Sequence, residues 1–351
     1  MPFARLPETV QTLYAELLDE LRAADAEAAA GAVGGSLVSK RIRGRVYWYL
    51  QRSEGTKKRQ IYLGPDESPF VERVRASIES RSGSPADQTR RRELVAMLAA
   101  GGMFRESASI GTVLRVLADA SVFRAGGVLV GTQAFTTLAN MLGVTFEKAS
   151  TRTADVDVAH DTAIPVALDE TRTESDLLDA LRASDPGFFA VPGLDVRAPS
   201  TSFSVRGRDL RVDFLTPDRS RGRSTKPVVL RHLGCAAQPL PGLDYLTEEV
   251  VDAAVLAGSG VRVNVPQPAR FVFHKLWVAA ERPVSEAAKA RKDLRQAAEM
   301  LEVLVVDRPG DVTAAYAAFA SRRTMRRRIA AQLTRLDSDL QRRLDPLLQD
   351  A

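Results

Sequence analysis

Cysteine and histidine are scarce in this sequence, which has one cysteine and three histidines in 351 residues. A single cysteine excludes an intramolecular disulfide and any multi-cysteine zinc site. Three scattered histidines also exclude a histidine-rich metal site. We interpret Cys235 as a packed or surface thiol rather than a nucleophile. A cysteine content this low is typical of proteins in the reducing cytoplasm.

Long apolar segments are missing as well. No apolar run approaches the roughly 20 residues that span a bilayer, and the N-terminal residues are too polar for a signal peptide. Hydrophobic residues make up 45% of the chain and charged residues 26%, which favours a folded globular protein over a disordered one. We therefore expect a soluble cytoplasmic protein with no membrane partner.

The positive charge is modest in total but clustered. The formal net charge is +5, yet residues 40–59 carry eight cations against the single acid Glu54, and residues 322–328 carry five arginines and no acid. Clusters of this kind hold polyanions or form a solvated basic face, and the sequence leaves both interpretations open.

Periodicity predicts an α/β (α+β) fold, with a mixed sheet flanked by helices, an N-terminal helix plus β-hairpin unit and a C-terminal helical region. Expected helices are 10–21, 68–80, 87–101, 110–120, 132–142 and most of 268–351, with breaks at Pro283, Pro309 and Asp345–Pro346. Expected strands are 126–131, 155–159, 251–257 and 260–265, with hairpins over 36–63 and 201–215. Trp48 is expected in the core of the first hairpin.

A linker at residues 82–85, Ser-Gly-Ser-Pro, marks the clearest boundary in the chain. We predict an N-terminal helix and basic hairpin unit over 1–83, an α/β domain over 84–267 and a C-terminal helical region over 268–351.

A glycine turn links the strand at 126–131 to the following helix. Gly131 and Thr132 stand where backbone must approach a ligand closely and where the N-terminus of the helix offers free N–H groups to phosphate. Strand–glycine–helix turns are common, so this pattern alone is weak evidence.

Three aspartates lie on apolar strands. Asp155 and Asp157 are two residues apart, so both side chains project from one face of a strand, and such a carboxylate pair suits Mg²⁺. Asp213 stands alone between Val212 and Phe214, where burial is costly without a partner. A metal shared by the three acids would offset the cost of burying Asp213. The alternatives are an exposed edge strand for Asp155 and Asp157, and a salt bridge from Asp213 to Arg211 or Arg208.

The glycine turn, the Asp-x-Asp strand and the later aspartate together resemble the polymerase-beta-type nucleotidyltransferase superfamily. Residues 126–160, with Gly-Gly-Val-Leu-Val-Gly-Thr, are similar to bacterial nucleotidyltransferases of the Leu-Val-Gly-Thr signature and to the related AbiEii-like toxin nucleotidyltransferases. The resemblance covers about residues 110–305. The superfamily usually has a serine or an alanine-rich variant where Thr132 stands here, so the hydroxyl is kept.

The resemblance implies further site residues on the later helices. Lys275, in Phe-His-Lys-Leu-Trp, takes the place of a lysine that contacts the triphosphate, and Asp293, in Arg-Lys-Asp-Leu, takes the place of a later catalytic aspartate. The alternatives are a solvent-facing Lys275 and an ion pair of Asp293 with Lys289, four residues earlier.

The resemblance implies an Mg²⁺-dependent enzyme that transfers a nucleoside monophosphate from a nucleoside triphosphate to an acceptor hydroxyl. Asp155, Asp157 and Asp213 would hold two Mg²⁺ ions, Asp213 would also help to deprotonate the acceptor, and Gly131, Thr132 and Lys275 would hold the triphosphate. The acceptor could be an RNA end, a protein hydroxyl or a small molecule. A toxin role and a cognate antitoxin partner follow from the resemblance alone.

The basic hairpin is the candidate RNA contact, because aromatic rings interleave with cations there and can stack on bases while the cations meet phosphates. The residues chosen for this role are Arg43, Arg45, Tyr47, Tyr49 and Lys57. The competing function is a nucleic-acid-binding or regulatory protein on a nucleotidyltransferase scaffold with a weak site.

Overall fold

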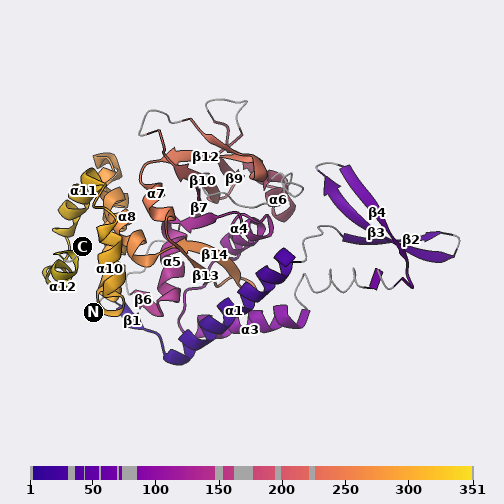
Figure 1. Cartoon of the computed structure of the whole chain (residues 1–351), viewed down its shortest axis with the longest axis horizontal. Helices are drawn as coiled ribbons and strands as arrows, with labels where there is room; N and C mark the ends of the chain where they lie inside the picture. The colour runs from indigo at the N-terminus through magenta and orange to yellow at the C-terminus, as the bar shows by residue number, and fades with distance from the viewer. Residues whose placement is uncertain are drawn as a thin grey trace.

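The computed structural model confirms the α/β fold (Figure 1). It describes residues 3–30, 36–42, 44–54, 57–68, 71–72, 85–146, 153–161, 177–193, 199–220 and 226–349. The helix predicted over 68–80 and the linker at 82–85 lie almost entirely outside the described residues.

A mixed sheet forms the centre of the protein, with strand order β11–β12–β10–β7–β5. Its strands are β5 (Gly127–Val130), β7 (Asp155–His160), β10 (Arg211–Pro217), β11 (Val228–Leu230) and β12 (Cys235–Leu240). β10 is parallel to β7 and β12, whereas β5 and β11 are antiparallel edge strands. β9 (Ser202–Val205) pairs with the start of β10, as the predicted hairpin requires, and β8 (Phe188–Ala190) pairs with β9.

Helices cover the sheet and fix the elements that carry the site. α4 (Ala108–Asp119) precedes β5, α5 (Gly131–Met141) follows it directly, and α6 (Leu177–Ser184) and α7 (Leu243–Thr247) pack nearby. The alternating pattern of β10 buries Val212 and Phe214 completely, while Asp213 between them faces the other side of the sheet.

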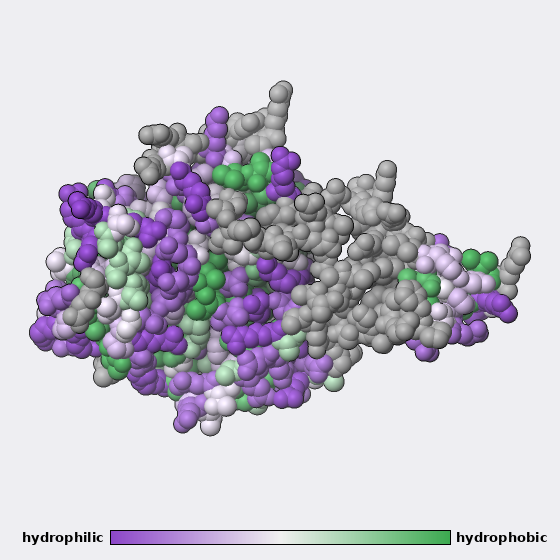
Figure 2. Space-filling model, in the orientation of Figure 1, coloured by the Kyte–Doolittle hydropathy of each residue, from purple (hydrophilic) through white to green (hydrophobic). Residues whose placement is uncertain are grey.

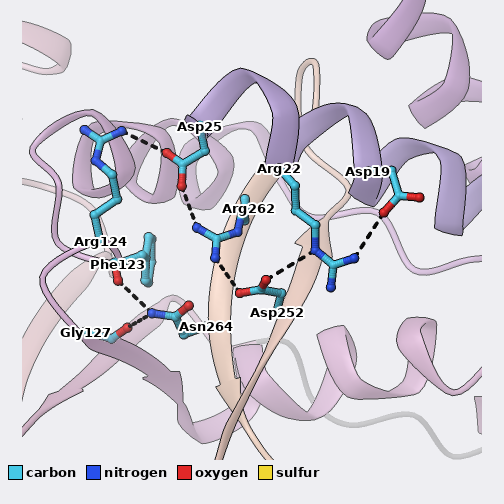
Figure 3. A network of polar contacts seen from close by, with 9 residues as sticks. All are labelled: Asp19, Arg22, Asp25, Phe123, Arg124, Gly127, Asp252, Arg262 and Asn264. Carbon is cyan, nitrogen blue, oxygen red and sulfur yellow. Dashed lines mark hydrogen bonds and ion pairs between the residues drawn. The ribbon is translucent and has the colours of Figure 1, made fainter. Parts of the chain in front are cut away.

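β13 (Val250–Val255) and β14 (Val261–Pro266) were predicted to complete the mixed sheet, and that prediction is wrong. They form a separate antiparallel pair. The Nδ2 atom of Asn264 donates hydrogen bonds to the carbonyl oxygens of Phe123 and Gly127, at 2.7 and 2.9 Å (Figure 3). β14 is therefore joined to the beginning of β5 by the side chain of Asn264 and not by backbone strand pairing.

The N-terminal helix α1 (Glu8–Ala30) is anchored on this pair of strands. Figure 3 shows Asp25 of α1 between Arg124 and Arg262, and Asp252 between Arg262 and Arg22. α3 (Pro85–Ala100) runs beside α1 (Figure 1), and Leu17 and Leu98 are fully buried. β1 (Phe3–Arg5) pairs with β6 (Val144–Phe146).

The basic unit has three strands where two were predicted. β2 (Ser36–Ile42), β3 (Arg45–Glu54) and β4 (Lys57–Pro65) form an antiparallel sheet that lies apart from the rest in Figure 1. Gly44, with φ +82°, makes the additional turn. Trp48 is half-buried and donates to Asp66 at 2.6 Å, so its predicted place in a core is wrong: a lone three-stranded sheet buries too little to enclose an indole.

The C-terminal region is helical, as predicted. Its helices are α8 (Pro268–Glu281), α9 (Ala287–Asp307), α10 (Pro309–Ala317), α11 (Arg323–Leu333) and α12 (Ser338–Gln349). The breaks at Pro283 and Pro309 are confirmed, but Pro346 lies inside α12. Burial of Leu340 and Leu344 stabilises that helix despite the missing N–H. The predicted division at 83/84 and 267/268 stays a prediction.

Hydrophilic residues dominate the face in Figure 2, and its hydrophobic residues form separate patches rather than one continuous area. Within the described part of the chain, none of the helices combines the length and the apolar character that crossing a bilayer demands.

Candidate active site

The three aspartates lie on two paired strands. Asp155 and Asp157 are on β7, and in the parallel pairing of β7 with β10 the partner of Asp157 is Asp213. Register partners on neighbouring strands point to the same face, and so do residues two apart on one strand. The three side chains therefore share one face of the sheet, although 56 positions separate Asp157 from Asp213.

These carboxylates repel one another. Burial raises the pKa of Asp157 to about 6, and the charges of Asp213 and Asp155 add to the increase, while Lys275 and Arg211 oppose it. The pKa of Asp155 is also raised, first by burial and then by Asp213 and Asp209. Neighbouring acids that raise one another's pKa favour a bound cation, because a cation between them cancels the repulsion.

Asp213 has two local partners. Its Oδ1 atom accepts a short hydrogen bond from the hydroxyl of Ser202, on β9, and a 2.9 Å hydrogen bond from Nε of Arg211. Among the residues that the structure describes, no three His, Cys, Asp or Glu side chains are grouped so that they could hold a metal ion. Asp155 and Asp157 offer the carboxylate donors that suit Mg²⁺, whereas Asp213 is engaged by Arg211, so a metal shared by all three stays a prediction.

Gly131 begins α5 and lies against the aspartates. Its φ is +69°, and a Cβ there would be 2.4 Å from Oδ2 of Asp157, so only glycine fits. Val130, the residue before the helix, makes no side-chain hydrogen bond to the helix start, and it is the register partner of Asp157. The N–H groups of the first turn and the positive end of the helix dipole thus lie beside the carboxylates.

Thr132 and Gln133 join the first turn of α5 to other elements. Thr132 is 9% exposed, and its hydroxyl accepts a 2.8 Å hydrogen bond from Nζ of Lys292 on α9. Gln133 donates to the carbonyl oxygens of Thr153 and Asp155 at 3.1 and 3.4 Å, which fixes the start of β7 beside the helix. The pKa of Lys292 is lowered by burial and by Lys275, while Asp293 and Asp155 act in the opposite direction.

Lys275 and Asp293 form a buried ion pair. The Nζ–Oδ1 distance is 2.7 Å, and the side chains are 11% and 3% exposed. Arg282, seven residues after Lys275, takes the other carboxylate oxygen at 2.6 Å. Both alternatives from the sequence are therefore wrong: Lys275 does not face solvent, and Lys289 pairs with Glu286 instead of Asp293.

This pair holds its charges in the folded state. Although burial acts to raise the pKa of Asp293, Lys275 and Arg282 hold it below its usual value. The ammonium of Lys275 also acts on Asp157, because it opposes the increase in the pKa of that residue. The triphosphate role of Lys275 and the catalytic role of Asp293 stay predictions.

Of the candidate RNA residues, Arg45, Tyr47 and Tyr49 lie on β3 and Lys57 begins β4, on the sheet that lies away from the aspartates (Figure 1). Arg45 is exposed, and the half-buried rings of Tyr47 and Tyr49 pack on Tyr62, with centroids 6.2 and 5.5 Å away. Arg43 and the side chain of Lys57 lie outside the described residues.

Sequence reasoning missed three residues of this site: Ser202, Arg211 as a positioning group, and Lys292. Lys292 directly precedes Asp293 in the Arg-Lys-Asp-Leu segment, so that segment carried the only signal. Arg211 was considered as a salt-bridge partner of Asp213, but Ser202 had no signal, because its contact arises from the pairing of β9 with β10.

This face of carboxylates beside a helix start is the arrangement that the resemblance to nucleotidyltransferases implies. A family model described as "Nucleotidyltransferase" matches residues 108–321, which is more than half of the chain. The chain belongs to this nucleotidyltransferase family. A second model, described as a domain of unknown function (DUF6788), matches residues 8–76.

Other comparisons add little. No curated protein matches the chain. Among solved structures, the crystal structure of an antigenic nucleotidyltransferase-like protein from Paracoccidioides brasiliensis is similar at 14% identity, over 64% of this chain and 94% of that one, with a TM-score of 0.33.

Proposed function

We propose that this protein transfers a nucleoside monophosphate from a nucleoside triphosphate to an acceptor hydroxyl, and that the acceptor is RNA. The observation that carries the proposal is the register of β7 with β10, which sets Asp157 beside Asp213 on the face where α5 begins. Family membership supplies the reaction class, and the contacts below support the role of each residue.

The triphosphate would bind at the start of α5. The free N–H groups of its first turn suit phosphate oxygens, and Gly131 has no side chain to obstruct them. Lys292, held by the hydroxyl of Thr132, adds a positive charge at the same place. Lys275 would act mainly through its field, because its ammonium is already paired with Asp293.

Asp155 and Asp157 would hold Mg²⁺. Their residue type, shared face and raised pKa values fit a divalent cation, which prefers one or two protein carboxylates together with substrate phosphates. A Mg²⁺ ion held by these two carboxylates would supply positive charge that neutralises the charge developing in phosphoryl transfer. A second ion, and the participation of Asp213 as a ligand, require Asp213 to leave Arg211.

Asp213 would accept the proton of the acceptor hydroxyl. Ser202 and Arg211 both hold its Oδ1 atom, so its orientation is fixed from one side. In the reaction a bond forms between the acceptor oxygen and the α-phosphorus, the bond from the α-phosphorus to the bridging oxygen breaks, and pyrophosphate leaves. The acceptor proton passes to the carboxylate of Asp213.

The three-stranded sheet supports RNA as the acceptor. Tyr62 is 55% exposed beside Tyr47 and Tyr49, and the Lys40 ammonium lies 4.9 Å from the Tyr49 ring centroid. Exposed rings with nearby cations suit stacked bases and their phosphates. A toxin role and an antitoxin partner stay predictions from resemblance.

The test incubates the purified protein with each α-labelled nucleoside triphosphate, Mg²⁺ and either total RNA or total protein. We expect label on RNA and its loss with Asp157→Asn. Label on protein would replace RNA as the acceptor. No label on either, with RNA binding intact, would favour the competing binding protein with a weak site.

A further inference from the structure

Three pockets follow one another along α4, from the candidate active site to the far end of the helix. The first, about 190 Å³, is lined by Thr132 and by Ser107 and Glu106 before α4. The second, about 410 Å³, shares Glu106 with the first. The third, about 560 Å³, shares Arg115 and Gly258 with the second.

One face of α4 forms a wall of this path. Ala108, Thr112 and Arg115 of the second pocket and Asp119 of the third are three or four residues apart in turn, and such spacing places them on the same side of a helix. Gly111 lets this helix lie directly on Ala257, because a Cβ there would be 2.5 Å from the Cβ of Ala257. Shared residues make the three pockets neighbours.

The third pocket is basic, and we call it the Arg91 pocket. It is lined by Arg91 and Arg92 of α3, Arg115 and Asp119 of α4, and Gln88, Gly258 and Ser259. The hydrogen bonds that Arg115 makes to described residues are long, at 3.4 Å to Ser259 Oγ and to the Ala257 carbonyl oxygen, and its charge also acts on Asp119. Three guanidinium groups therefore face a single carboxylate.

Arg91 is the unusual member of this pocket. It is 7% exposed, its Nε atom is buried without a hydrogen-bond partner, and no ion pair joins it to any residue that the structure describes. A buried cation without a counter-charge is costly, and proteins rarely keep one. The guanidinium of Arg91 thus lines a pocket and can donate hydrogen bonds to an anion that enters it.

We infer that the Arg91 pocket binds a phosphate group of the RNA acceptor, while the neighbouring pockets along α4 lead the strand to Thr132, in the first turn of α5. A guanidinium gives two parallel hydrogen bonds to a phosphate, which a solvated lysine cannot do. The second and third pockets are too small for a duplex and suit a single strand. The RNA part of this inference rests on the proposed function; the phosphate site does not.

The first experiment measures melting temperature with inorganic phosphate, in EDTA. Phosphate should raise the melting temperature of the wild type, because a ligand that binds only the folded state stabilises it. Arg91→Met should abolish that increase and should itself melt higher than the wild type without phosphate, because it removes an uncompensated buried charge. Lys292→Ala, in the candidate active site, should keep the part of the increase that Arg91→Met removes.

The opposite pattern of melting temperatures would contradict a phosphate site at Arg91. If Arg91→Met melts lower than the wild type and keeps the response to phosphate, Arg91 has a structural role only. Arg92→Gln is the second variant: Arg92 is exposed, so its loss leaves the core intact and should still weaken the response to phosphate. An unchanged response in Arg92→Gln and in Arg91→Met contradicts the inference.

The second experiment titrates salt against binding of a labelled 15-nucleotide oligouridylate, without nucleoside triphosphate. The combined Arg91→Met and Arg92→Gln variant should flatten the log–log slope by about 0.7 for each phosphate of the single strand that the variant no longer neutralises. The matched control replaces two exposed arginines outside both basic clusters, Arg335→Gln and Arg342→Gln, and should keep the wild-type slope.

The two proposals fail separately. A flattened slope in a protein that transfers no nucleotide supports the Arg91 pocket and contradicts the proposed function. An unchanged slope in a protein that does transfer nucleotide to RNA contradicts the pocket alone. A response to phosphate with no change in the RNA slope identifies a site for free phosphate and overturns the RNA assignment.

Discussion

Lys292 donates a 2.8 Å hydrogen bond to the hydroxyl of Thr132, and so joins α9 to the first turn of α5 across 160 positions of sequence. This contact places a cation at the end of the helix where a triphosphate would bind. Lys275, which the sequence analysis proposed as the triphosphate contact, instead forms an ion pair with Asp293. The two lysines should therefore fail in different ways when they are replaced.

Lys292→Ala should weaken nucleoside triphosphate binding by about 10- to 100-fold, because a hydrogen bond to a charged group contributes about 1.5–3 kcal/mol. Stability should change little, since the side chain is only half-buried. Lys289→Ala is the control, because Lys289 is exposed and pairs with Glu286. Equilibrium binding of each labelled triphosphate measures the effect, and equal affinities for the two variants would remove Lys292 from the site.

Lys275→Met should destabilise the protein by about 3 kcal/mol, at the lower end of the cost of breaking a buried ion pair, because Arg282 still holds Asp293. The double variant Lys275→Met with Asp293→Leu should recover most of that loss. Urea unfolding measures both. If Lys275→Met unfolds like the wild type but loses triphosphate affinity, the lysine contacts the phosphates directly.

Asp157→Asn should stabilise the protein above pH 6. The pKa of Asp157 is raised to about 6, so the folded state binds its proton more tightly than the unfolded state does. Stability from this group therefore falls as pH rises from about 4 to about 6 and stays low above that. The variant should exceed the wild type by up to about 3 kcal/mol at pH 7.5, and the two should converge near pH 4.

Denaturation across this pH range, in EDTA, tests the sign. Asp161→Asn is a matched control that changes an acid paired with Arg219 outside the cluster. Equal stability of Asp157→Asn and wild type at pH 7.5 would show that the three carboxylates do not repel one another as their placement requires.

Replacing Arg43, Arg45 and Lys57 together with alanine should flatten the salt dependence of RNA binding by up to about two units on a log–log plot, at about 0.7 per phosphate contact. Triphosphate binding should not change, because Arg45 and Lys57 belong to strands of the separate three-stranded sheet. Tyr62→Ser should weaken binding by about 1–3 kcal/mol per stacked base with little effect on the slope. Identical slopes for wild type and triple variant would identify a solvated basic face.

The local periodicity of the sequence predicted most of the helices and strands. The spacing in α1 and the alternation in β7 and β10 predicted those elements, since each depends on residues close in sequence. β13 and β14 were assigned to the wrong sheet because strand pairing depends on residues far apart in the sequence, and no local pattern records that these two strands pair outside the mixed sheet. The third strand of the basic sheet was missed because Ser36–Ile42 alternates weakly.

Prediction of the candidate active site was limited in the same way, because local patterns do not record long-range contacts. The shared face of Asp155 and Asp157 follows from a two-residue period, but the register that brings Asp213 to Asp157 depends on pairing across 56 positions. The choice between Lys275 and Lys292 depended on how α8 and α9 pack, which no local pattern records. Neither the Ser202 contact nor the burial of Arg91 has a signature in the sequence.

Cys235 lies on β12 with none of its surface exposed, and it is the one cysteine in the chain. The folded protein thus presents no native thiol to a maleimide dye. A cysteine introduced at Val284, which is 93% exposed, would be labelled alone without first removing Cys235. A second introduced cysteine on the three-stranded sheet would give a donor–acceptor pair, so fluorescence energy transfer could follow the distance between that sheet and the helical region as RNA binds.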